Sequence, residues 1–177
     1  MRYTRRIRGA GYIIWQSKHE LFHVLLGVVW AWILREAWGE FNLKWLFLSI
    51  FGSLLPDIDH LVYFFTYGRT NWYSKEVKQL LRSREWRSAA KFISHGHKYN
   101  TELMSHNIYV VIFLIISSFF CLILGWRVWV VVIGAMVSHF FFDIIDDYFV
   151  LGHLNHNWKR RWRRKPKNNP DLNLEKS

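Results

Sequence analysis

The chain has 177 residues, of which 51% are hydrophobic and 19% are aromatic, and it carries a formal net charge of +11 at pH 7. A chain this apolar, with 11 tryptophans, is not an ordinary soluble domain of its size. The single cysteine, Cys121, excludes an intramolecular disulfide and argues against a metal site built from thiolates.

Four apolar blocks predict four transmembrane helices, near residues 19–38, 43–65, 107–126 and 128–150. The third block has no charged residue from Ile108 to Trp126, which is about the 20 residues that one bilayer crossing needs. The second and fourth blocks reach that length only with neighbouring segments that are apolar except for His or Asp. We therefore expect an all-α fold, in which residues 1–157 form an integral membrane bundle of about four transmembrane helices.

Two segments outside the apolar blocks are polar and basic. Within the loop of residues 66–106, Lys75 to Phe92 has helical spacing with a partial apolar face, which predicts an amphipathic cytoplasmic helix at the membrane interface. Residues 158–177 begin as a polybasic run with interleaved Trp and then become polar. This composition predicts a disordered tail.

The distribution of Lys and Arg predicts how the spans are oriented. Five of these residues lie in residues 1–20, eight from Arg69 to Lys98, and eight from Lys159 onward. By the positive-inside rule, both termini and the middle segment are cytoplasmic in a multi-pass membrane protein.

The basic tail predicts a partner at the membrane surface. Each basic side chain near an anionic surface contributes about 1 kcal/mol of attraction. Nucleic acid is the other partner that such a run can bind, and we expect none here. The tail residues expected to bind anionic headgroups are Arg160, Arg161, Arg163, Arg164 and Lys165.

Ionisable residues interrupt the apolar blocks, and on this topology all of them approach the cytoplasmic leaflet. A carboxylate at membrane depth costs at least about 2.5 kcal/mol, so it is normally paired, bound to metal or turned to water. The residues concerned are His19 and His23 in the first span, Asp57, Asp59 and His60 in the second, His106 before the third, and His139 and Asp143 in the fourth.

The spacing of these residues favours a metal site. His19 and His23 are four residues apart, as are His139 and Asp143, so each pair projects from one helical face. Imidazole and carboxylate are ligands for zinc, iron or manganese, and facing helices of a bundle can hold one or two such ions. A metal would also neutralise the buried carboxylates.

Each group alone has a simpler interpretation. His139 and Asp143 could form a hydrogen-bonded pair between spans, and PDIDH could be a helix break with an aspartate N-cap. A histidine in a basic loop or tail is more often part of an amphipathic surface than a ligand, as for His95, His97, His153 and His156. The joint arrangement favours a site, because four coincidences would otherwise fall on one side of one membrane.

HELFH, from His19 to His23, also matches the H-E-x-x-H pattern of zinc metalloproteases. In that pattern the two histidines hold zinc and the glutamate, here Glu20, is the general base. Asp57 or Asp59 could supply the third ligand. An intramembrane metalloprotease is therefore an alternative function.

Three motifs together resemble the YdjM-like family of membrane-bound metal-dependent hydrolases, which are small inner-membrane proteins. They are LLPDIDH from Leu54 to His60, SHN from Ser105 to Asn107, and SHFFFD from Ser138 to Asp143. The chain departs from the family pattern at Asn107, where the family has Ser, and in the position of His95 and His97, nine to eleven residues before His106. The resemblance implies metal-dependent hydrolysis.

We therefore expect a hydrolase with one or two metal ions, most often zinc for such ligands, at the cytoplasmic leaflet. The metal would lower the pKa of a bound water toward about 7 and polarise the scissile bond. Asp57 or Glu20 would accept the proton. A phosphoester in a lipid headgroup would already lie at the depth of the site, and a non-enzymatic metal-binding scaffold or transporter is a further alternative.

Overall fold

The computed structural model describes residues 10–101 and 103–159, with backbone only for residues 10–19, 94, 95, 97–100 and 150. The described residues form helices joined by turns, with no β-strand among them, so the predicted all-α fold is confirmed. In chain order the elements are α1 (Ala10–Trp38), α2 (Leu43–Leu54), the 3₁₀ helix η1 (Leu55–Asp57), α3 (Ile58–Phe65), α4 (Trp72–Arg82), α5 (Trp86–Asn100), α6 (Ile108–Ile123), α7 (Arg127–Leu151) and the 3₁₀ helix η2 (His156–Lys159).

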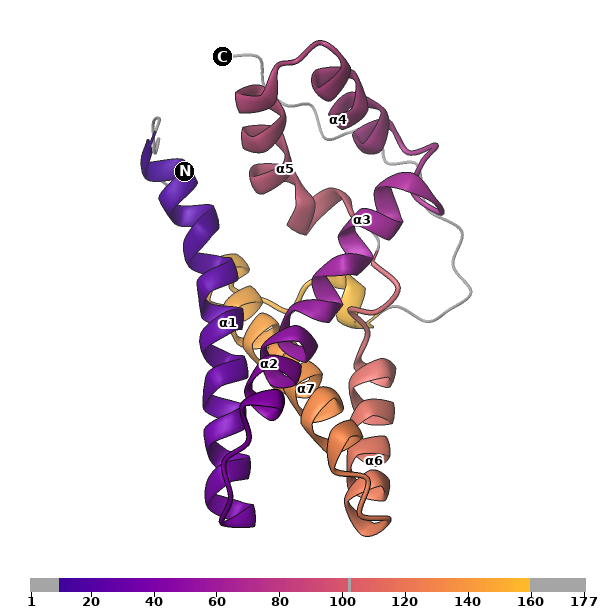
Figure 1. The fold of residues 1–177 in the computed structure, drawn as a ribbon. Coiled ribbons are helices and arrows are strands. Elements are labelled where there is room, and N and C mark those ends of the chain that lie inside the picture. Colours follow the sequence, from indigo (N-terminus) through magenta and orange to yellow (C-terminus); the bar gives the residue numbers. More distant parts are fainter. Residues whose placement is uncertain (1–9, 102, 160–177) are drawn as a thin grey trace.

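Helices α1, α2, α6 and α7 form the bundle, with α7 packed against the other three (Figure 1). Helix α3 continues from α2 through η1 and leads to α4 and α5, which lie beyond one end of the bundle (Figure 1). The connections between α1 and α2 and between α6 and α7 lie at the opposite end (Figure 1). The bundle therefore has two ends with different structures: one continues into α3, α4 and α5, and the other has two short connections.

Three stretches of the described chain are long and apolar enough to cross a membrane: Glu20–Trp38, Leu43–Phe65 and Arg127–Phe149. The second runs through α2, η1 and α3. Helix α6 is also apolar, but its 16 residues extend only about 24 Å at 1.5 Å per residue. It is therefore shorter than the predicted span of residues 107–126, and the structure supports a membrane protein with three to four long apolar helices.

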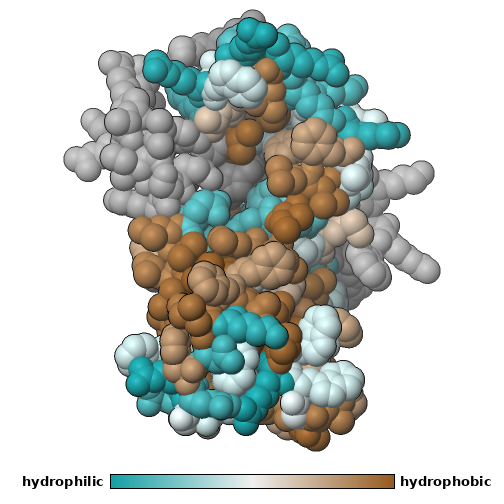
Figure 2. Space-filling view, viewed as in Figure 1, coloured by the Kyte–Doolittle hydropathy of each residue, from teal (hydrophilic) through white to brown (hydrophobic). Residues whose placement is uncertain are grey.

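The surface of the bundle is apolar in a band. Figure 2 shows hydrophobic residues gathered over the bundle, with hydrophilic residues at both ends of the molecule. Large apolar side chains such as Phe47 and Phe113 expose 63% and 66% of their surface. Water would penalise so much exposed apolar area, whereas lipid tails would not.

Small residues of α1 and α2 allow α1 and α7 to approach α2 closely. A Cβ atom at Gly27 of α1 would lie 2.6 Å from the Cα of Ile50, and one at Gly52 would lie 2.6 Å from the backbone oxygen of Val132 in α7. The Ser49 hydroxyl donates to the Gly27 carbonyl at 2.7 Å. Close backbone contact through Gly and Ser is typical of helices packed in membranes, and here it fixes α1 and α7 on either side of α2.

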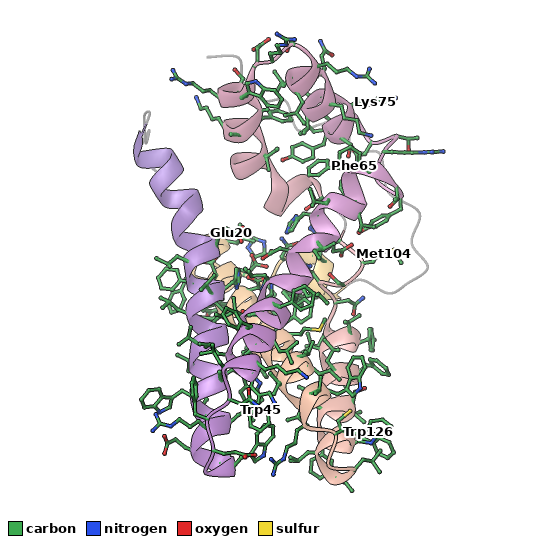
Figure 3. The ribbon with its side chains drawn as sticks, in the orientation of Figure 1. Glu20, Trp45, Phe65, Lys75, Met104 and Trp126 are labelled. Carbon is green, nitrogen blue, oxygen red and sulfur yellow. The ribbon has the colours of Figure 1, made fainter. Side chains whose placement is uncertain are left out.

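The end of the bundle that lies away from α4 and α5 carries an aromatic and charged belt. Trp45 and Trp126, labelled in Figure 3, lie there. The Arg127 guanidinium pairs with Glu40 and lies 5.1 Å from the ring centroid of Trp38. Tryptophan and Arg side chains are typical of a membrane–water interface.

The other end is held by a separate apolar cluster that joins α3 to α4 and to the chain before α6. Its buried members are Tyr63, Phe64, Tyr73, Val77 and Leu103. The predicted amphipathic segment from residue 75 to 92 falls across α4 and α5, which separate near Arg84, where φ is 61°.

Candidate metal site

One face of α7 carries the first two residues of the site. His139 and Asp143 lie one helical turn apart, with the Nε2 atom of His139 3.0 Å from Oδ2 of Asp143. Asp147 follows after another turn and is also buried. Side chains four residues apart share a helical face, so this face of α7 is polar although the helix is apolar over most of its length.

Two further histidines reach Asp143 from other elements. His23 of α1 places its Nε2 atom 3.5 Å from Oδ1 of Asp143. His106, in the turn before α6, places its Nε2 atom 3.2 Å from Oδ2. Three imidazoles from three parts of the chain therefore converge on one carboxylate.

The rings of His23 and His139 are stacked, with centroids 3.8 Å apart and an interplanar angle of 22°. Both side chains are fully buried. Two imidazolium ions in this arrangement would repel each other strongly in a low-dielectric interior. The stack is better suited to neutral imidazoles that offer lone pairs.

His23, His139 and Asp143 form a group that could hold a metal ion, because one ligand atom from each lies within 4.8 Å of the others. The predicted metal-binding capacity is thus supported by the structure for these three residues. The donor set, two imidazole nitrogens and one carboxylate, suits zinc and other transition metals better than magnesium or calcium.

The second nitrogen of His139 has a partner that fixes its tautomer. Its Nδ1 atom lies 2.6 Å from the backbone oxygen of Ser53. A carbonyl oxygen only accepts hydrogen bonds, so Nδ1 must carry the proton. In a neutral imidazole the lone pair is then on Nε2, the atom that faces Asp143.

The sequence explains why a carbonyl of α2 faces His139. Pro56, two residues beyond the end of the helix, has no backbone N–H to donate to a carbonyl one turn back. The chain tightens into η1 at this point. The last carbonyl groups of a helix lack intrahelical partners, which favours their use by side-chain donors.

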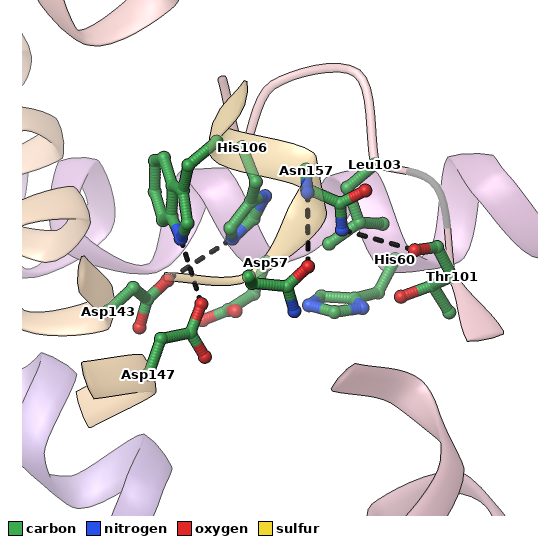
Figure 4. A pocket seen from close by; sticks show the side chains of 10 residues that line it. Asp57, His60, Thr101, Leu103, His106, Asp143, Asp147 and Asn157 are labelled. Atoms are coloured by element: carbon green, nitrogen blue, oxygen red, sulfur yellow. Dashed lines mark hydrogen bonds and ion pairs between the residues drawn. The ribbon is translucent and has the colours of Figure 1, made fainter. Parts of the chain in front are cut away.

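A cavity of about 40 Å³ opens beside this group (Figure 4). A buried water needs about 10–15 Å³ of such volume, so the cavity has room for an ion or a few waters but not for a whole lipid headgroup. Its lining residues are Asp57, His60, Thr101, Leu103, His106, Asp143, Asp147, Asn155, Asn157 and Trp158.

The PDIDH segment divides its ionisable residues between two places. Asp57 and His60 are three residues apart, share a face and both line the cavity. The Oδ1 atom of Asp57 lies 3.9 Å from Nε2 of His139. Asp59, two positions from Asp57, points to the other side of the helix, because neighbours at that spacing do not face each other.

Asp59 binds the segment that leads to His106. Its Oδ2 atom accepts hydrogen bonds from the backbone N–H of Ser105 at 2.8 Å and from the Ser105 hydroxyl at 2.7 Å. Its Oδ1 atom accepts from the Tyr67 hydroxyl at 2.5 Å. Burial and this hydrogen bond raise the pKa of Tyr67, which therefore stays a donor throughout the physiological range. Asp59, expected as a metal ligand, thus forms hydrogen bonds with Ser105 and Tyr67 and does not face the His23–His139–Asp143 group.

Glu20 of α1 is exposed and is not among the described residues that line the cavity. The side chains of His19, His95 and His97 lie outside the described residues, as do the tail residues Arg160, Arg161, Arg163, Arg164 and Lys165. His153 and His156 are exposed.

Sequence reasoning missed the residues that close the cavity from the C-terminal side. The Trp158 indole donates to Oδ2 of Asp147 at 2.8 Å, and the Asn157 amide donates to the Thr101 backbone oxygen at 3.1 Å. Trp158 is only 3% exposed, although the predicted tail began at residue 158. Asp147 had a usable signal, since it continues the four-residue spacing of His139 and Asp143. Asn157 and Trp158 had none, because their role depends on the chain folding back.

Comparison with known proteins supports the motif-based resemblance. No curated protein and no solved structure gave a significant match. The family model described as YdjM inner membrane protein matches residues 19–150, which include all the described residues that converge on Asp143. The chain therefore belongs to the YdjM inner membrane protein family.

Proposed function

We propose that the protein is a membrane-embedded metal-dependent hydrolase whose zinc is held by His23, His139 and Asp143, with His106 as a further ligand. The observation that carries the proposal is the orientation of His139. Its Nδ1–H is bound to the Ser53 carbonyl, and its Nε2 faces two carboxylates. A metal-bound histidine typically donates a hydrogen bond from its other ring N–H to a carbonyl or carboxylate in this way.

Charge balance supports a divalent cation. A neutral His139 would direct its Nε2 lone pair at the oxygens of Asp143 and Asp57, which are acceptors too. A cation among these atoms converts the repulsion into attraction. Two carboxylates also match the charge of one zinc ion, which removes the cost of placing them at membrane depth.

Zinc at this place would lower the pKa of a bound water to about 7 and polarise a phosphoester oxygen. The carboxylate of Asp57 lines the cavity beside the ligand group, and it is 22% exposed, so it can accept a proton and pass it to solvent. His60 lines the same cavity and can donate a proton to a leaving group. A second ion would find its ligands among these cavity residues.

The proposed membrane topology has four crossings, with α6 as the shortest and both termini cytoplasmic. The basic residues of α4 and α5 lie beyond the end of the bundle that holds the candidate metal site. The aromatic and charged belt lies at the other end (Figures 1 and 3). Helix α4 is amphipathic, with Tyr73 and Val77 packed against α3 and Lys75 exposed. Its exposed basic side would face anionic headgroups at the cytoplasmic interface. A phosphoester in a lipid headgroup would reach the cavity from this leaflet.

Elemental analysis of the purified protein tests the metal. We expect stoichiometric zinc in the wild type, a loss in His139→Ala and a partial loss in His106→Ala. His153→Ala removes an exposed histidine outside the cavity lining and serves as the matched control, with unchanged zinc. A wild type without metal, purified without chelators, would contradict the proposal.

Hydrolysis assays separate the enzyme classes. We expect the wild type to cleave a phosphodiester or phospholipid in detergent micelles, and Asp143→Asn to be inactive. Glu20→Gln should keep this activity. If Glu20→Gln abolished an activity on peptides instead, the metalloprotease would be favoured, and a zinc-loaded protein that cleaves no ester, lipid or peptide would indicate a scaffold or transporter.

A further inference from the structure

We propose that Asp59 is a positioning residue that acts through Ser105 to hold His106 in one tautomer, with its Nε2 lone pair directed at Asp143. The inference rests on the proposed function for the free Nε2 lone pair, which needs a cation beside Asp143, but not for the proton on Nδ1. The hydrogen bonds themselves are features of the folded chain. They join α3 to a turn 46 residues later in the sequence.

The position of the Ser105 proton follows from its two neighbours. The Ser105 hydroxyl lies 2.7 Å from Oδ2 of Asp59 and 3.1 Å from Nδ1 of His106. A carboxylate has no proton to give, so the hydroxyl must donate to Asp59. Its oxygen is then left as the acceptor for His106, and Nδ1 of His106 must carry a proton.

The tautomer of His106 determines what its other nitrogen can do. With Nδ1 protonated, a neutral imidazole has its lone pair on Nε2. That atom lies 3.2 Å from Oδ2 of Asp143, the same oxygen that His139 approaches, so its lone pair is available to a cation held there. Without a cation, Nε2 would carry a proton as well and donate it to Asp143. Asp59 thus plays toward His106 the part that the Ser53 carbonyl plays toward His139, with the Ser105 hydroxyl interposed.

Asp59 also fixes the backbone that carries His106. It accepts the Ser105 backbone N–H, and the Tyr67 hydroxyl that it binds accepts the backbone N–H of Met104 at 3.2 Å. On the far side of His106, Asn107 caps α6 by accepting from the backbone N–H of Tyr109. The backbone of His106 is therefore held on one side by hydrogen bonds to Asp59 and on the other side by the start of α6.

The inference assigns distinct roles to the two aspartates of PDIDH. Asp57 faces the cavity and the reacting groups, whereas Asp59 faces the protein and supports a ligand. Partners that orient a metal-bound histidine typically change metal affinity about 10- to 100-fold when they are removed. Ser105 provides a sensitive test, because its side chain can be removed while its backbone bond to Asp59 stays.

The first measurement is the ring-nitrogen NMR spectrum of His106 in the metal-free protein in detergent micelles, assigned with His106→Gln. We expect Nδ1 of His106 to carry a proton in the wild type and in Ser105→Thr, which keeps the hydroxyl, and this proton to be lost in Ser105→Ala. A wild-type His106 whose only proton is on Nε2 would overturn the inference. This readout does not need bound metal, so it stands apart from the proposed function.

The second measurement is zinc affinity by competition with a chelator. We expect Ser105→Ala to bind zinc about 10- to 100-fold more weakly and Ser105→Thr to bind nearly as the wild type does. Asp59→Ala should lose at least as much as Ser105→Ala, and Tyr67→Phe should lose little. Equal affinity in Ser105→Ala and wild type would overturn the inference. A wild type whose His106 carries the Nδ1 proton but which binds no zinc would support the role of Asp59 and Ser105 and contradict the metal site.

Discussion

The two ends of the bundle hold their charges under different conditions. At the end with the α1–α2 and α6–α7 connections, Arg127 and Glu40 pair with about half of each side chain exposed. At the other end, Asp143 is 12% exposed and lies among His23, His106 and His139. Water can solvate the first pair even when it is broken, whereas the second group meets solvent only through the small cavity beside it. An exposed charge pair therefore contributes little to stability. A buried cluster needs a cation or protons to balance its charge.

The largest effect is expected from Asp143→Asn, which keeps the shape of the side chain but removes the charge on which three imidazoles converge. Outer-shell partners of a metal already contribute about 10- to 100-fold in affinity or activity, so loss of this ligand should exceed 100-fold for both. Metal content and ester hydrolysis measure it. A zinc-loaded, active Asp143→Asn protein would show that the buried charge is no more important than the exposed pair at the other end.

Metal removal should produce the next largest effect. A ligand held at 1,000 times its dissociation constant stabilises the folded state by about 4 kcal/mol. A strong chelator should therefore lower the melting temperature of the wild type in detergent. The chelator should leave Asp143→Asn unchanged, and an equal drop in both proteins would mean that the chelator acts elsewhere.

The packing between α2 and α7 should give an intermediate effect. A Cβ at Gly52 would meet the Val132 backbone oxygen at 2.6 Å, so Gly52→Ala must move one of these helices. Overpacking of this kind costs about 1–3 kcal/mol. Because His139 depends on the Ser53 carbonyl next to Gly52, we also expect weaker zinc binding, measured by chelator competition. A lower melting temperature with unchanged zinc affinity would show that this packing stabilises the fold without affecting the metal site.

The smallest effect is expected from Arg127→Ala at the opposite end. An exposed ion pair contributes about 0–1 kcal/mol, and Arg127 adds cation–π contacts with Trp38 and Trp45 at the same end of the bundle. Thermal unfolding should shift little, and zinc content should stay at the wild-type level. A loss of zinc in this variant would show that the two ends are coupled.

The sequence predicted much of the fold because its signals are local. Apolar blocks and their length indicate membrane-spanning helices, and three of the four predicted spans have the length and composition to cross a membrane. Helix α6 is shorter because Asn107 caps it at its first turn and the chain turns at Gly125, where φ is 70°. Capping and turn geometry act at single residues, so hydropathy averaged over a block does not detect them.

The sequence by itself determined which residues share a helical face. The spacing of His139 and Asp143 fixes their common direction, because the α-helix repeats every 3.6 residues. The same periodicity puts Asp57 and Asp59 on different sides. It does not say which side meets the site.

Only the tertiary structure decided that Asp57 faces the cavity and that Asp59 binds Ser105 and Tyr67. It also decided that the Ser53 carbonyl receives His139 and that Trp158 returns to bind Asp147. These partners are separated by 86 and 11 residues along the chain, and no periodicity links them. Ser53 and His139 meet because Gly27, Ser49 and Gly52 leave little side-chain bulk between the helices, so the backbones approach and bring His23 and His139 into one stack.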